Sequence, residues 1–442
     1  MSTETKPLCV VRAPCATRSG YGDMSRDIIR HLIEYDKFDV KVHSVNWGDT
    51  PMNALDSNDP KDKVILDRIL YEPINQQPDL FISITVPNEF QPMGKFNIGI
   101  TAGIETTACS AEWIEGCNRM NLILTISEHS KRVFESSKYS VQNNQGQQQA
   151  VLEVKVPVEV LHNCVHTDVF GKNAPTDITA TKKLDEIPEQ FCYLFVGHWL
   201  RGDFGEDRKN VALLVKMFLE TFKQIKDKPQ PALILKTSSA GFSILDREEI
   251  LGKIGQIRNS VKLELGQKMP NIYLLHGELT EKEMNTLYNH SKVKVHISLT
   301  KGEGFGRPLL EASVSGKPVI ASGWSGHVDF LDVEHAILVG GELKNIHPSA
   351  VWDNVLIKES SWFAPDPQQA ADAMALAFME YTSVKKKAYD LALKNRKQFS
   401  YESIKEKTFE LLDKYVPEFP KHVPLVLPKL KKLELPQLKK SE

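Results

Sequence analysis

Two carboxylates, Glu303 and Glu311, lie in one short stretch of the chain, with a glycine turn at 304–306 directly after the first of them. A carboxylate only accepts hydrogen bonds, which suits it to hold the hydroxyls of a sugar or a ribose. The apolar run 293–299 predicts a strand before the turn, and Pro308 predicts the first turn of a helix after it. Free N–H groups at that helix N-terminus would attract phosphate. We expect both carboxylates to face one small pocket; the alternative is a surface helix with two solvated acids.

A second candidate group is the basic pair Arg208-Lys209, which lies between an apolar run at 191–196 and a helix predicted over 211–223. Cations oppose the helix dipole at a helix N-terminus, so a pair of them indicates a bound anion more than a solvated helix start. Lys236 ends the next predicted central strand, where it can either reach phosphate or be solvated.

The chain also begins with a strand, a glycine loop and a helix, the opening of a doubly wound α/β fold. The strand is predicted at 8–12 and the helix at 24–35, with the loop 19–22 between them. Glycines there either let the backbone approach a ligand or form an ordinary turn. Glu105 follows the strand predicted from residue 96, at the sheet edge where open α/β sheets bind ligands. It is either an acceptor-site residue or a helix N-terminal acid.

The stretch Glu303 to Ala312 resembles the signature of family-4 retaining glycosyltransferases, also called glycosyl transferases group 1. The resemblance implies the GT-B fold: two Rossmann-like doubly wound α/β domains that face a cleft, and a C-terminal helix that crosses back to the first domain. It also implies transfer of a sugar, with retention of configuration, from a nucleotide-diphosphate donor. UDP-sugar is the default donor, and no cofactor or metal is expected.

The same resemblance assigns roles to individual residues. Glu311 would bind the ribose, Glu303 and the backbone of 304–306 would orient the sugar, and Lys209 would neutralise the diphosphate, with Arg208 or Arg201 as the second cation. The predicted catalytic group is Glu303, Lys209, Arg208 and Glu105. The predicted donor-binding residues are Gly20, Tyr21, Gly22, Gly197, His198, Lys236, His276, Gly277, Gly304, Phe305, Gly306, Leu310 and Glu311.

Three residues depart from the family pattern. His198 stands where the family has an arginine, which leaves the second cation open. Cys164 and His166 replace a glycine and an aspartate of the motif between the domains, so we expect them to mark a position in the chain and not to carry chemistry.

Chain length, net charge and cysteine spacing limit the class of protein. A chain of 442 residues favours two or three domains. A net charge of -2 argues against attraction of nucleic acid or membrane over the whole surface, though not against a local basic cleft. The six cysteines show no zinc-type spacing, which favours reduced thiols, and no signal peptide or membrane span is predicted. A cytoplasmic location is expected.

We predict five regions along the chain. They are an acceptor domain at 1–170, a linker at 171–190, a sugar-nucleotide domain at 191–385, crossover helices at 386–420, and a basic proline-containing tail at 421–442. The tail is either a solvated or packing segment or an arm for an anionic surface.

Two segments of the first half, 44–55 and 86–92, resemble uncharacterised glycosyltransferases encoded by large T-even-like bacteriophages. That resemblance implies a hydroxymethylated pyrimidine of phage DNA as the acceptor, and host cytoplasm as the location. Three alternatives stay open: a hexosyl- or pentosyltransferase that acts on a glycan, protein or small molecule; another GT-B enzyme such as a sugar-nucleotide epimerase; and a non-catalytic protein that binds sugar or nucleic acid. Nucleotide, sugar and oligomeric state are not determined by these residues.

Overall fold

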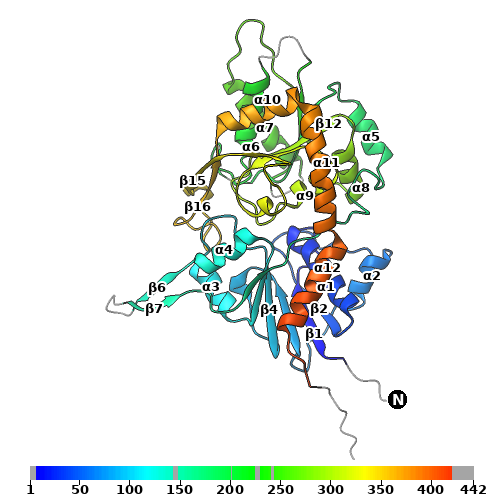
Figure 1. Ribbon diagram of the computed structural model, residues 1–442, viewed down its shortest axis with the longest axis vertical. Helices are drawn as coiled ribbons and strands as arrows, with labels where there is room; N and C mark the ends of the chain where they lie inside the picture. The colour runs from blue at the N-terminus through cyan, green and yellow to red at the C-terminus, as the bar shows by residue number, and fades with distance from the viewer. Residues whose placement is uncertain (1–5, 143–147, 201, 224–228, 240–242, 421–442) are drawn as a thin grey trace, which may run out of the picture.

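The computed structural model describes residues 6–142, 148–200, 202–223, 229–239 and 243–420. Two domains lie one above the other along the longest axis of the molecule (Figure 1), and each is built on a six-stranded sheet. Arg201, the alternative second cation, and the tail 421–442 lie outside the described residues.

The sheet of the first domain has the order β2-β1-β3-β4-β5-β8, and its neighbouring strands pair in parallel. Most of its strand residues are buried, as expected for a parallel sheet with both faces covered. The strands are β1 (Leu8–Ala13), β2 (Asp39–Ser44), β3 (Leu80–Ile84), β4 (Phe96–Thr101), β5 (Leu122–Thr125) and β8 (Val158–Val160).

Helix α1 begins four residues earlier than predicted, at Gly20 instead of Met24. The helix starts earlier because Ser19 caps it: the Ser19 hydroxyl accepts a hydrogen bond from the Gly22 N–H at 3.0 Å, and residues 20–22 form the first helical turn. The helices of this domain are α1 (Gly20–Tyr35), α2 (Pro60–Leu66), α3 (Ala111–Asn118) and α4 (Glu128–Ser136). A hairpin, β6 (Tyr139–Gln142) with β7 (Gln148–Leu152), projects to one side (Figure 1).

The second sheet has the order β11-β10-β9-β12-β13-β14, again with parallel pairing. This is the strand order of a dinucleotide-binding Rossmann sheet, in which ligands bind where the order reverses, here between β9 and β12. The strands are β9 (Cys192–Val196), β10 (Ala232–Lys236), β11 (Ile272–Leu275), β12 (Val293–Ser298), β13 (Val319–Ser322) and β14 (Ile337–Val339). The helices are α6 (Val211–Phe222), α7 (Ile244–Ser260), α8 (Glu281–Asn289), α9 (Arg307–Val314) and α10 (Pro367–Met379).

The segment predicted as a linker, 171–190, contains a helix, α5 (Ile178–Asp185). Asp177 caps this helix, and its backbone N–H donates to the Thr286 hydroxyl of α8 at 2.6 Å. The polar composition of the segment concealed the helix because only Leu184 within it is buried. The segment therefore packs on the second domain and is not a free connection.

The C-terminal helices cross between the domains as predicted. Helix α11 (Tyr381–Gln398) packs on α9, and α12 (Tyr401–Tyr415) packs on α1, so the two run down one side of the molecule (Figure 1). The His31 ring of α1 and the Thr408 hydroxyl of α12 are hydrogen-bonded at 3.0 Å in the buried contact. The boundary predicted at residue 385 falls inside α11.

A second connection between the domains comes from the hairpin β15 (Gly341–Asn345) with β16 (Ser361–Pro365). At its end the backbone of Ser361 exchanges hydrogen bonds with Thr107 of the first domain, both at 2.9 Å. This contact lies two residues from Glu105, so it helps to fix the loop that carries that carboxylate.

All six cysteines are buried and free. Within the described part of the chain, no helix combines the length and the apolar character that a bilayer span requires.

Candidate active site

The glycine turn at 302–306 joins β12 to α9 at the carboxyl edge of the second sheet. Pro308 lies in the first turn of α9, as predicted, and Gly306 precedes the helix with φ of 93°, a conformation that favours glycine. A Cβ on Gly302 would lie 2.1 Å from the Glu105 carbonyl oxygen, and one on Gly304 would lie 2.8 Å from that of Ala102. Glycine at both positions therefore lets the turn press against the loop after β4 of the first domain.

Two cations meet two carboxylates at this turn. Lys209 Nζ donates to both oxygens of Glu303, at 2.6 and 2.7 Å. Arg208 Nη1 lies 3.1 Å from Glu105 Oε1 and 3.6 Å from Glu303 Oε2, and it donates to the Gly302 carbonyl at 2.9 Å. The four residues predicted as the catalytic group are thus brought together, with Arg208 joining the two domains.

Burial and these charges set the protonation states. Burial alone would raise the pKa of Glu303, but Lys209 and Arg208 outweigh it and lower that pKa to about 2. Burial lowers the pKa of Lys209, against the pull of Glu303. Burial would also lower the pKa of Arg208, yet Glu105 and Glu303 raise it. Each cation has a carboxylate partner: Lys209 has Glu303, and Arg208 has Glu105 and Glu303.

These side chains line a cavity of about 440 Å³ between the domains. Twelve of the predicted site residues line it: Gly20, Tyr21, Glu105, Gly197, His198, Arg208, Lys209, Lys236, Glu303, Gly304, Phe305 and Gly306. The helices α1 and α9 begin at its wall, so their N-terminal N–H groups and dipoles favour an anion there.

Five predicted residues do not line this cavity: Gly22, His276, Gly277, Leu310 and Glu311. Leu310 is buried in the core, and a Cβ on Gly22 would lie 2.2 Å from the Thr17 carbonyl oxygen, so both serve packing. His276 and Gly277 line a neighbouring cavity of about 540 Å³ with α5, β11 and α8. There the His276 ring contacts the Asp246 carboxylate.

Glu311 differs from the expectation that it would share a pocket with Glu303. It lies in the second turn of α9, where the Tyr288 hydroxyl donates to Oε2 at 3.0 Å and Arg307 Nε lies 3.9 Å from Oε1. Burial raises the pKa of Glu311 to about 7, although Arg307 and Tyr288 oppose the rise. Spacing within the motif could not show that Glu303 lines the cavity and Glu311 does not.

The first-domain wall holds Tyr21, predicted to bind the donor. Its hydroxyl is hydrogen-bonded to the Thr101 hydroxyl and accepts from the Ala102 N–H, both at 3.0 Å, and its ring stacks on Trp47 with centroids 4.1 Å apart. Opposite, His198 Nδ1 lies 3.2 Å from the Ser238 hydroxyl, and burial and then Lys209 lower the pKa of His198.

Sequence reasoning missed several residues of the cavity wall. Four of them follow the carboxyl ends of parallel strands, namely Trp47, Asn163, Thr237 and Ser238, while Met24 lies in α1 and Arg307 is the first residue of α9. Position after a strand was the available signal, since ligands bind at that edge. Arg307 Nη1 also lies 3.1 Å from Asp23 Oδ2, which adds an ion pair between α9 and α1.

The turn 323–329 follows β13 and is hydrogen-bonded to the backbone of Glu303. The Ser325 hydroxyl accepts the Glu303 N–H at 2.9 Å, and the Gly326 N–H donates to the Glu303 carbonyl at 2.9 Å. It therefore positions Glu303, and none of its residues lines the 440 Å³ cavity.

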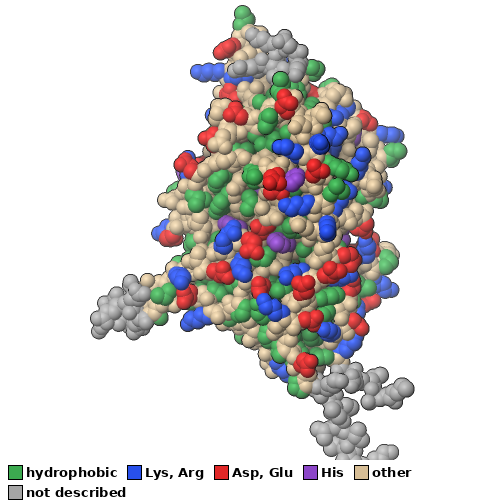
Figure 2. All heavy atoms as spheres, in the orientation of Figure 1, with side chains coloured by type: hydrophobic (Ala, Val, Ile, Leu, Met, Phe, Trp, Pro, Cys, Tyr) green, Lys and Arg blue, Asp and Glu red, His purple; other side chains and the backbone are tan. Residues whose placement is uncertain are grey.

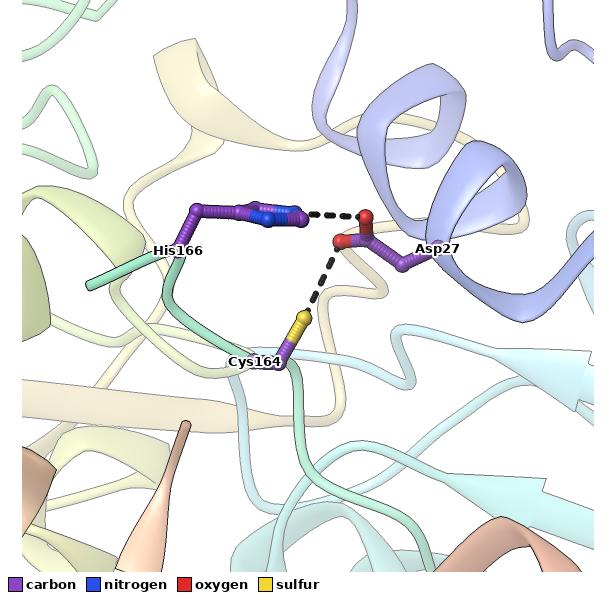
Figure 3. A group of neighbouring side chains, drawn as sticks. All are labelled: Asp27, Cys164 and His166. Atoms are coloured by element: carbon purple, nitrogen blue, oxygen red, sulfur yellow. Dashed lines mark hydrogen bonds and ion pairs between the residues drawn. The ribbon is translucent and has the colours of Figure 1, made fainter. Parts of the chain in front are cut away.

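Cys164 and His166 meet Asp27 of α1 behind the cavity (Figure 3). Asp27 accepts from His166 Nε2 at 2.8 Å and from Cys164 Sγ at 3.3 Å. Cysteine, histidine and aspartate are metal-ligating types, but Arg30 Nη1 lies 3.6 Å from the same carboxylate, and a further cation beside it would be repelled. The group fits a hydrogen-bond network that ties α1 to the segment after β8.

Comparison with known proteins agrees with this architecture. Residues 208–336 match the family model described as Glycosyl transferases group 1, a range that includes Lys209, Glu303 and Glu311. No curated protein matches the chain.

Solved structures are similar over nearly the whole chain. HepE of Anabaena, in complex with UDP and glucose, has a TM-score of 0.56 at 14% identity, over 92% of this chain and 100% of that one. Sucrose-phosphate synthase of Thermosynechococcus elongatus has 0.58 at 12% identity, over 92% and 98%. A glycosyltransferase of Rickettsia africae has 0.58 at 12% identity, over 93% and 99%. The chain has the GT-B fold, and the match to the glycosyl transferases group 1 model lies in its second domain.

Proposed function

We propose that this protein is a retaining glycosyltransferase that moves a hexosyl or pentosyl group from a nucleotide-diphosphate sugar to a hydroxyl. The observation that carries the proposal is the convergence of Lys209, Arg208 and Glu303 in the cavity between two Rossmann-like domains. UDP-sugar is the proposed donor, supported by the complex of the similar HepE with UDP and glucose.

The cations would act on the leaving group. Sugar transfer releases a nucleoside diphosphate, and charge that develops on it is stabilised by preorganised donors in a site that excludes water. Lys209 and Arg208 supply that charge, and the N-terminus of α9 adds backbone donors. Because both cations are paired with carboxylates here, a bound diphosphate would take over part of that pairing.

The carboxylates would hold hydroxyls. Glu303 would orient the transferred sugar and Glu311 the ribose, while backbone near His276 and Gly277 would lie beside the nucleobase. Neither glutamate has to act as a nucleophile, because the departing phosphate oxygen can accept the proton of the acceptor hydroxyl on the same face of the sugar. That geometry retains the anomeric configuration.

The first acceptor to test is a hydroxymethylated pyrimidine of DNA, because segments 44–55 and 86–92 resemble phage-encoded glycosyltransferases. On the face drawn in Figure 2, the described Lys and Arg side chains are interspersed with Asp and Glu. DNA contacts would then be local ones at the cavity mouth, with the base flipped out of the duplex. The proposed location is the cytoplasm, that of the host if the gene is a phage gene.

The test is incubation of the purified protein with a panel of UDP- and GDP-sugars, with and without DNA that contains hydroxymethylcytosine. Nucleotide release and the masses of digested nucleosides are measured, with the Lys209→Met variant as the inactive control. A sugar-sized mass gain on the modified base identifies donor and acceptor together. Nucleotide release without a DNA product moves the acceptor to a glycan, protein or small molecule. No release from any donor contradicts the proposal and favours a binding protein.

A further inference from the structure

The first-domain wall of the cavity contains a stacked pair of aromatic rings, Tyr21 and Trp47, and none of the roles above uses Trp47. Trp47, in the loop after β2, lines the cavity together with Tyr21, Glu105 and Asn163. Its ring stacks on Tyr21 with 27° between the planes. Across the cavity lie the cations and Glu303, so this wall is the side on which an acceptor would enter.

The loop that carries Trp47 is fixed and not a loose strand connection. The Val45 N–H donates to the Ala13 carbonyl at 3.1 Å, and the Ala54 N–H donates to the Ala16 carbonyl at 3.0 Å. Arg18 binds the same loop twice, through its N–H to the Pro51 carbonyl at 3.2 Å and through Nε to Asn53 Oδ1 at 2.9 Å. With the Tyr21 hydroxyl also held, the indole is preorganised at little entropic cost to a ligand.

We infer that Trp47 is a stacking platform for the acceptor, which presents a flat ring face to the indole and a hydroxyl to the cations and Glu105. This inference rests on the proposed function and specifies its acceptor class. An indole offers a large rigid apolar face, and both the π-face of a nucleobase and the C–H face of a pyranose stack on such a surface. Neighbouring Asn163 and Glu105 can hold polar groups at the rim of either ring.

The test measures binding of two ring compounds, 5-hydroxymethyl-2′-deoxycytidine and methyl α-D-glucopyranoside, by calorimetry with and without UDP. One of the two is expected to bind the wild type and so to identify the ring type. Trp47→Ala is expected to raise its Kd about tenfold, and Trp47→Phe about threefold or less. UDP affinity and the thermal unfolding midpoint of each variant are measured alongside, to separate loss of the platform from loss of fold.

Trp352→Ala is the matched control, because Trp352 is 55% exposed in the loop between β15 and β16 and does not line the cavity. It is expected to leave the Kd of the ring compound unchanged. Equal affinity of Trp47→Ala and wild type for the ring compound would overturn the platform, as would binding of neither compound to the wild type. Failure of UDP to bind the wild type would instead contradict the proposed function. In that case the role of Trp47 is still decided by the affinity of the wild type and of Trp47→Ala for the ring compound, measured without UDP.

Discussion

Glu303 lies between two cations at the glycine turn, whereas Glu311, one helical turn into α9, lies against a tyrosine hydroxyl with a single arginine at 3.9 Å. Burial pushes the pKa of both carboxyls upward. Lys209 and Arg208 reverse that effect for Glu303 and lower its pKa to about 2, while Arg307 and Tyr288 leave that of Glu311 raised to about 7. The type of residue is the same, and the number of nearby cations decides its protonation state.

The difference separates two tasks within one motif. A carboxylate that is ionised at every physiological pH can hold a lysine in place for a diphosphate. One that titrates near neutrality makes ligand binding depend on pH. Four predictions test this contrast, in order of decreasing effect.

The largest effect is expected for Lys209→Met. Removing the cation that would stabilise the leaving diphosphate should lower kcat by about two to three orders of magnitude, the scale seen when one preorganised donor is lost. Nucleotide release under saturating donor measures it. Lys282→Met, at an exposed position of α8, is the control and should keep wild-type turnover. A Lys209→Met enzyme that turns over like the control would remove Lys209 from the site.

The second prediction concerns Glu303→Gln and stability. The Glu303 side chain is only 8% exposed, so its loss leaves Lys209 buried with a neutral partner, while Arg208 keeps its ion pair with Glu105. The free energy of unfolding in urea at pH 7 should fall by about 3 kcal/mol. The double variant with Lys209→Met should lose less than the sum of the two single losses, by about 1–3 kcal/mol. Strict additivity would show that the pair does not interact.

The third prediction uses the opposite pKa shifts. A carboxyl whose folded pKa lies above its unfolded value stabilises the fold below pH 4.5, and that contribution is lost as pH rises through about 7. Glu311→Gln should therefore gain stability relative to wild type between pH 5 and pH 8, by about 2 kcal/mol. The contribution of Glu303 has the other sign: it is present above pH 4.5 and is lost as pH falls through about 2. A pH-independent difference between Glu311→Gln and wild type would contradict the raised pKa.

The smallest effect is expected for Tyr288→Phe. The lost hydroxyl no longer donates to Glu311, so the carboxylate is less stabilised and its pKa rises further. If the ionised Glu311 carboxylate accepts hydrogen bonds from the ribose hydroxyls, the affinity for UDP should increase as pH rises through about 7 in the wild type. The midpoint pH of that increase should be about half a pH unit higher in Tyr288→Phe. Calorimetric titration of UDP at several pH values measures both. A flat affinity profile in the wild type would take Glu311 out of the donor site.

Short-range patterns predicted much of the fold and the charged part of the cavity. The strand, turn and helix around Glu303 and the basic pair at Lys209 depend on neighbours within a few residues, and the structure has these elements as expected. The crossing of α12 onto α1 came from the resemblance to GT-B proteins, and the structure confirms it.

The features that the sequence did not predict depend on contacts between segments that are distant along the chain. Asp27 meets Cys164 and His166 across more than a hundred residues, and no spacing along the chain indicates such a group. Helix α5 buries only one side chain, so its composition resembled a linker. Trp47 lay in a polar loop, and only the packing of that loop on the segment 13–18 shows that its ring lines the cavity.

The most direct test of the proposed activity is the anomeric configuration of the product. Wild-type protein is supplied with UDP-α-D-glucose and with the acceptor compound that gives the fastest release of UDP. The configuration of the glycosidic bond formed is assigned by proton NMR, and the Lys209→Met variant is the inactive control. The proposal predicts that UDP appears together with an α-linked product. A β-linked product would contradict retention, and an intact donor across the whole panel of sugars would contradict transfer itself.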